Sequence, residues 1–241
     1  MQSVCRAVAQ RFGWDGSPVP CALDASQICR LRRPAPPAAN PELGDHSEAE
    51  GLYRSALAVR ASALGPEDPD VAVTAHNLGV CLAATGQHAE ALVFHKQALF
   101  VREAAAAAAA AAGGGGGAAA RGEVLASHKA AAACLRRLGC EGQAEPHLSA
   151  LLDAARGRAD GDAVAGSSGG GGGVRRRRDA LLELSAAAED FARCLAAQGA
   201  HARAEDALWE ALEARREALG AQHPSVRLLE DKITSCLEAL Q

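Results

Sequence analysis

One pattern recurs along this chain and limits its fold more than any other feature of the sequence. In the segments that start at Gly44, Gly86 and Gly199, an alanine lies five residues after the glycine. Two further positions of the pattern lie four and seven residues after that alanine, and the second of these is again alanine. A weaker copy starts at Gly139. Small residues spaced by seven lie on one helix face and let a neighbouring helix approach closely. The pattern therefore predicts an all-α fold of antiparallel helix pairs, with each glycine at the turn inside a pair.

The spacing of the copies indicates two insertions. Successive copies are 42, 53 and 60 residues apart, and the excess over 42 falls in low-complexity tracts near 104–120 and 157–178. We interpret these tracts as flexible inserts, because runs of alanine and glycine bury little apolar surface. A second motif has the same register, since the hexapeptide at 64–69 recurs at 219–224, three repeats later.

Capping residues and apolar periodicity together give the expected helices. Gly65 and Gly220 follow helical runs, and Asp68-Pro69 is a typical helix start. The predicted domain organisation is an irregular segment over 1–42 and a repeat domain over 43–241. The expected helices are 45–64, 69–85, 87–104, 123–138, 142–156, 179–198, 201–219 and 224–240.

The residues of the second copy carry a specific resemblance. Leu64-Gly-Pro-Glu-Asp-Pro-Asp-Val-Ala72, His76-Asn-Leu-Gly79 and Gly86 with Ala89-Glu-Ala91 resemble the 42-residue tetratricopeptide repeat of kinesin light chains. Residues 44–103 and 179–240 carry this resemblance well, and 122–156 carry it weakly. The resemblance implies a tetratricopeptide-type superhelix of antiparallel helix pairs that binds peptides or partner proteins.

In such a superhelix the first helix of each pair lines a concave groove. We expect the partner-binding residues at the groove positions of these first helices, and we treat Arg102, on a second helix, as an outward-facing control position. Only Asn77 matches the Lys/Asn/Arg clamp by which some tetratricopeptide proteins hold a C-terminal carboxylate, so no clamp is predicted. The candidate groove residues are His76, Asn77, Val80, Lys129, Arg136, Glu189, Asp190, Arg193 and Lys232.

Four of the eight cysteines occupy one repeat position, with leucine after each. They are Cys81, Cys134, Cys194 and Cys236, and we interpret them as small apolar core residues. Equivalent positions in a solenoid are roughly 10 Å apart per helix layer, which is too far for a shared metal. No metal or cofactor is predicted. The chain also has no nucleophile elbow, phosphate-binding loop or zinc-protease motif, so we predict no enzymatic activity.

Composition also limits the classes of partner that we expect the chain to bind. A net charge of −4 provides no basic field for nucleic acid, and no apolar run is long enough to span a membrane. The absence of a secretory signal favours the cytoplasm, although Arg6 and Arg11 in an acid-free start leave an organelle transit peptide as an alternative. We interpret Arg175–Arg178 as a solvated linker end rather than an import signal or anion patch.

The predicted function is a protein-interaction scaffold or adaptor. The alternative is a degenerate structural or assembly subunit without a dedicated peptide ligand.

The first repeat is incomplete. Its missing first helix would fall over Pro34, Pro36 and Pro37, and each proline inside a helix costs about 3 kcal/mol. The helix at 45–64 must therefore find another cover for its apolar face. A short N-terminal helix at 2–12, a second chain through self-association, and a truncated gene product are three open explanations.

Overall fold

The computed structural model describes residues 45–111, 117–165 and 171–238, and every regular element in these ranges is an α-helix. The all-α prediction is therefore confirmed. No helix in these ranges is long and apolar enough to cross a bilayer. The eight described helices are α3 (Asp45–Leu64), α4 (Pro69–Ala84), α5 (His88–Ala111), α6 (Gly117–Arg137), α7 (Glu141–Ala165), α8 (Gly171–Ala197), α9 (His201–Leu219) and α10 (Pro224–Glu238).

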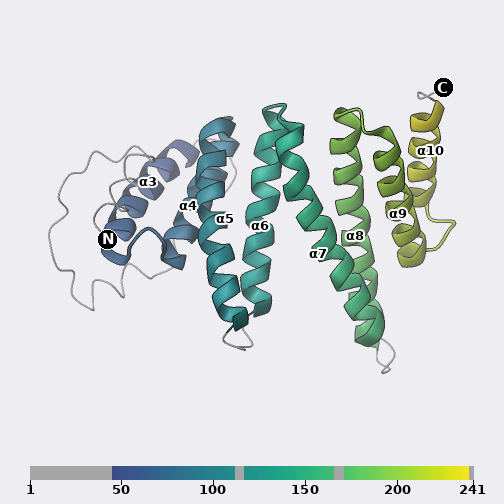
Figure 1. The fold of residues 1–241 in the computed structure, drawn as a ribbon, viewed down its shortest axis with the longest axis horizontal. Coiled ribbons are helices and arrows are strands. Elements are labelled where there is room, and N and C mark those ends of the chain that lie inside the picture. The colour runs from purple at the N-terminus through teal and green to yellow at the C-terminus, as the bar shows by residue number, and fades with distance from the viewer. Residues whose placement is uncertain (1–44, 112–116, 166–170, 239–241) are drawn as a thin grey trace.

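These helices form a solenoid. Each helix packs on the helices before and after it in the chain, and α4 also contacts α6. Figure 1 shows a single row that runs from α3 at one end to α10 at the other. The pairs α4–α5, α6–α7 and α8–α9 are complete repeats. Helix α3 corresponds to the second helix of a pair, and α10 corresponds to the first helix of a pair; we call these second-type and first-type helices. Because each helix contacts mainly its neighbours in the chain, a surface that extends over several repeats is formed by equivalent helices of successive pairs, such as their first helices.

The predicted glycine turns close each pair in the same way. Gly86 has φ of 82°, a conformation that costs glycine little, and the Gln87 amide donates to the Leu82 carbonyl at 2.8 Å. This bond, five residues back, is the Schellman motif that satisfies a free carbonyl at a helix end. Gly139 and Gly199 form equivalent turns, with φ of 71° and 77°.

Helix starts between repeats also follow the predicted chemistry. The Asp68 carboxylate accepts a hydrogen bond of 2.9 Å from the Asp70 amide, and Pro69 occupies the first helical position. In the last repeat His223 stands where Asp68 does, and its Nδ1 accepts from the Ser225 amide at 3.3 Å.

The expectation of flexible inserts is wrong for the described part of both tracts. Helix α5 continues through the alanine run to Ala111, and α6 already begins at Gly117. Alanine has the highest helix propensity of all residues, so a run of it extends the helix that precedes it. The first insert therefore lengthens a helical hairpin, and only 112–116 lie outside the described residues.

The second insert lengthens the next hairpin in the same manner. Helix α7 runs to Ala165 and α8 starts at Gly171. Ala159 is 7% exposed and packs in one core with residues of α8, so part of this tract is buried. The arginine run 175–178 lies on α8 rather than in a linker, and Arg177 is ion-paired with Glu217 of α9.

The repeat cysteines are core residues, as predicted, wherever the structure describes them. Cys81, Cys134 and Cys194 are 4%, 2% and 0% exposed and pack among leucine and alanine. Burial raises the pKa of all three thiols. The side chain of Cys236 lies outside the described residues.

Candidate partner-binding face

We call the predicted groove positions of the first helices α4, α6, α8 and α10 the groove face. In its central part, two arginines from neighbouring helices bind one carboxylate. Arg136 of α6 lies 3.5 Å from Asp190 of α8, measured Nη1 to Oδ1, and Arg193 also pairs with Asp190. The three candidates therefore form one cluster that joins two repeats.

A second cluster connects α8 to the last helix. Glu189 pairs with Arg215, and its other carboxylate oxygen lies 3.3 Å from Nζ of Lys232. Arg215 belongs to α9, a second helix, so the groove positions of the first helices do not predict it. Exposed ion pairs of this kind contribute about 0.2–1 kcal/mol each, so a ligand could rearrange those of Lys232 and Arg193 at small cost.

The part of the groove face nearer α3 has a different character. Asn77 is half-buried, Val80 is 44% exposed and Lys129 is exposed. The repeat positions of Asn77 and Val80 are occupied by Ala130 and Ala133 in α6. This half of the face thus offers a shallow surface of small side chains, with one amide and one cation.

His76 makes its main contact inside the repeat. Its ring lies against that of His95 in α5, with centroids 5.1 Å apart and planes at 60°. Burial, and secondarily the charge of Arg102, lowers the pKa of both histidines to about 4, so both imidazoles are neutral at pH 7. No described residue bonds to the buried Nδ1 of either ring.

Gly79 explains why His95 fits at this position. A Cβ added at Gly79 would lie 2.6 Å from Cε1 of the His95 ring, closer than real Cβ contacts occur. The missing side chain lets α5 place an imidazole against the backbone of α4. Gly79 is thus a packing residue, two positions after the groove residue Asn77 and on a different side of α4.

Arg102 is not the outward-facing control that its second-helix position suggested. It is 7% exposed, and its guanidinium donates to the Ser127 hydroxyl at 2.7 Å and to the Glu123 carbonyl at 3.2 Å. These bonds connect α5 to α6. A substitution here would disturb the fold, so it cannot serve as a control for binding.

In the α6–α7 repeat, two histidines stand where the α4–α5 repeat has an apolar contact in its core. His128 and His147 stand at the repeat positions of Ala75 and Phe94. Their Nδ1 atoms are 2.9 Å apart, and Nε2 of His128 lies 3.5 Å from the Glu103 carboxylate. One ring must donate and the other accept, which requires at least one neutral imidazole.

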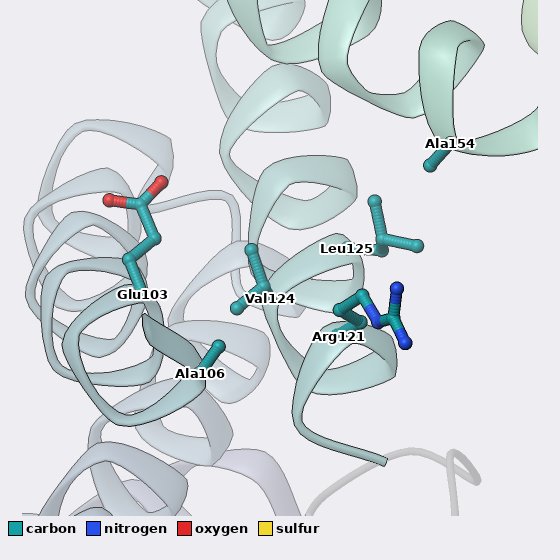
Figure 2. A pocket seen from close by; sticks show the side chains of 6 residues that line it. All are labelled: Glu103, Ala106, Arg121, Val124, Leu125 and Ala154. Carbon is teal, nitrogen blue, oxygen red and sulfur yellow. The ribbon is translucent and has the colours of Figure 1, made fainter. Parts of the chain in front are cut away.

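Next to this pair, the helices leave a pocket of about 240 Å³. Figure 2 shows side chains of α5, α6 and α7 around it, with Ala154 facing Leu125 across the gap. Ala154 occupies the repeat position of Val101, which is larger and 4% exposed in its own core. The lining residues are Glu103, Ala106, Arg121, Val124, Leu125 and Ala154.

Within the residues that the structure describes, no three metal-ligating side chains converge. The groove face presents side chains for hydrogen bonding, charge pairing and apolar contact.

Comparison with known proteins agrees with this architecture. Sequence models of the tetratricopeptide repeat match residues 42–104 and 184–225. No curated protein sequence matches the chain. The crystal structure of BtubC (BKLC) from P. vanneervenii aligns over 98% of this chain and 80% of its own, at 16% identity and a TM-score of 0.50. At that identity the likeness concerns the fold alone.

A putative kinesin light chain from Podosopora anserina, with nearly identical TPR-like repeats, also aligns with the chain. The alignment covers 74% of this chain and 91% of that one, at 16% identity and a TM-score of 0.31. From the repeat matches and the solenoid of helix pairs, we conclude that the chain contains tetratricopeptide repeats in an all-α solenoid, an architecture that in general supports a protein-interaction scaffold.

Proposed function

We propose that the groove face binds an extended peptide segment of a partner protein. The observation that carries the proposal is the contrast along this face. Its α4–α6 half has small side chains with an accessible cation at Lys129, whereas its α6–α10 half holds two ion-paired clusters around Asp190 and Glu189. A peptide could thus place small or aliphatic residues on the first half and polar residues on the second.

Asn77 is central to this proposal. Its amide can donate and accept at once, so it can bind a peptide backbone whatever the peptide's sequence. His76, beside it, would contribute only the part of its ring that the contact with His95 leaves exposed. Val80, Arg136 and the remaining groove candidates would contact side chains of the peptide.

The test uses three single variants of the full chain: Asn77→Ala, Lys129→Glu and Arg193→Gln. Partners captured by wild-type protein are identified by mass spectrometry, the bound segment is mapped with synthetic peptides, and Kd is measured. Loss of the Asn77 bond should cost about 0.5–1.5 kcal/mol. The effect of Lys129→Glu should act mainly on the association rate and should decrease with added salt.

Lys96→Glu is the matched control, because Lys96 is an exposed lysine on the second helix α5. It should leave Kd unchanged within about twofold, since it reverses the same charge off the groove face. If Lys96→Glu weakened binding as much as Lys129→Glu, the partner would use another face. If no groove variant altered binding by any identified partner, the assembly-subunit alternative would be favoured.

A further inference from the structure

Two imidazole rings meet between α6 and α7, and the bond that joins them depends on protonation. Nδ1 of His128 lies 2.9 Å from Nδ1 of His147. A ring nitrogen donates when it carries a proton and accepts when it does not, so the bond forms only while at least one ring is neutral. With both rings protonated, two N–H groups and two positive charges would face each other. Acid must therefore break this contact.

The other complete repeats have no titratable group at these positions. Ala75 and Phe94 occupy them in the α4–α5 pair, and Ala188 and Ala207 occupy them in the α8–α9 pair. The three alanines are 0%, 0% and 5% exposed, and Phe94 packs against a core formed by α4 and α5. Packing of a helix pair at these positions thus needs only apolar side chains. The histidines give the α6–α7 pair a dependence on pH that its neighbours lack there.

Charged groups of α5 determine the order in which the two rings bind protons. The Glu103 carboxylate lies 3.5 Å from Nε2 of His128. Burial lowers the pKa of His128, and the charge of Glu103 opposes this shift. Burial also lowers the pKa of His147, and the charges of His128 and Lys96 lower it further. In the described part of the chain, no charged group of α4 or α8 contributes to either shift. His128 therefore takes the first proton and can donate to His147, and a second proton on His147 removes the acceptor.

The histidines lie where α6 and α7 begin to diverge. On the side of their turn, Leu135 of α6 and Leu148 of α7 share a core. On the other side, the pocket of about 240 Å³ lies between Leu125 and Ala154. Figure 1 shows the two helices separating from the turn toward their other ends. A break at the histidines would therefore adjoin a space that already exists.

We propose that the His128–His147 contact is an acid-sensitive latch, which holds α7 against α6 at neutral pH and releases it when both rings are protonated. Released rings are hydrated and bind protons near the ordinary histidine pKa of roughly 6.5, whereas the latched pair can hold only one proton. Each additional proton bound in the released state favours release about tenfold per pH unit. The latch is therefore intact above roughly pH 6.5 and weakens as the pH falls toward 5.

Hydrogen exchange of the full chain at pH 7 and pH 5 tests the latch. Protection is expressed relative to the intrinsic exchange rate at each pH, so that only opening is compared. In peptides from 124–137 and 141–154, protection should fall by about tenfold or more at pH 5. Peptides from 201–219 should lose much less, because α9 meets α8 through Ala207 and Ala188 rather than through histidines.

Two double variants carry the apolar residues that the other repeats use. His128→Ala with His147→Phe copies the α4–α5 pair, and His128→Ala with His147→Ala copies the α8–α9 pair without adding volume. Each variant should remove most of the pH effect in α6 and α7. His201→Ala is the matched control, because it removes an exposed imidazole outside the pair, and it should leave the effect unchanged.

Three results would overturn the proposal. The first is unchanged protection of α6 and α7 in the wild type at pH 5. The second is an equal loss in 201–219, which would mean that acid unfolds the whole chain. The third is a pH effect in both double variants as large as in the wild type. All three are measured on the free chain, so none depends on whether the groove face binds a peptide.

Discussion

Individual side chains between α4 and α5 show how a groove position is coupled to the core. His76 is on the predicted groove face, yet its ring contacts His95, and His95 in turn lies against the backbone at Gly79. Arg102 lies close enough to both rings to lower their pKa. Changes at these four residues should therefore affect stability first, and any ligand effect would follow from that.

The two histidines make stability depend on pH in a defined direction. Their pKa is about 4 in the folded chain and near 6.5 when unfolded, so the unfolded state binds more protons between these values. The stabilisation is complete above pH 6.5 and is lost as pH falls toward 4. For His95, which is 1% exposed, it amounts to about 2 kcal/mol between pH 7 and pH 5.

Urea unfolding at pH 7 and pH 5 measures this loss. His95→Gln cannot titrate, so its stability should change less between the two pH values than that of the wild type. The pKa of His128 and His147 is also lowered by burial, so part of the pH dependence should persist in this variant. An equal loss in wild type and variant would contradict the assignment to His95.

Gly79 gives a second prediction at this scale. Gly79→Ala should destabilise the fold by about 1–3 kcal/mol, because the new methyl group overlaps the His95 ring and α5 must shift. In a double-mutant cycle, most of this cost should disappear in the background of His95→Ala. Additive effects of the two changes would show that the glycine matters for another reason.

Helices show where sequence patterns predict structure well and where they do not. The ends of α3 and α9 fall at the predicted residues, because glycine turns and apolar periodicity are local signals. Low complexity predicts a flexible insert at the ends of α5 and α7, whereas the helix propensity of alanine favours the extended helices that the structure has. The pairing of Arg136 with Asp190, and of Glu189 with Arg215, depends on side chains that meet across helices, and no spacing in the sequence encodes that contact.

The α6–α7 pair borders the pocket described above, and this pocket can be filled. Ala154→Val supplies the residue that the α4–α5 repeat has at Val101, and a cavity-filling change of this kind commonly stabilises by about 0.5–2 kcal/mol. Valine lowers helix propensity by about half a kcal/mol relative to alanine, so Ala186→Val, at an exposed position in the interior of α8, measures that cost alone. Ala154→Val should therefore have the higher urea midpoint of the two. Equal midpoints would mean that the pocket does not admit the added methyl groups.

At the scale of the whole molecule, the described helices do not share a single central core. Its buried side chains form several clusters along the row of helices in Figure 1, and each cluster joins neighbouring helices. The two ends of the row also differ, since α10 carries Arg227 and Glu230 where α4 has buried alanines, and α3 exposes Leu52 and Val59. In such an architecture stability is a sum of local terms, so local opening can be followed with probes distributed along the chain.

Three cysteines are natural probes of this kind. Cys81 and Cys134 share one core and Cys194 lies in the next, whereas Cys140 is half-buried at a turn. A thiol reagent followed by peptide mass mapping at pH 8 should label Cys140 first and the three core thiols at least about 100-fold more slowly, which corresponds to an opening free energy of about 3 kcal/mol. The raised pKa of the core thiols acts in the same direction, because it lowers their thiolate fraction. In denaturing urea all four should react at similar rates. If any core thiol reacted as fast as Cys140 in the native protein, the helix pair that contains it would not be packed as described.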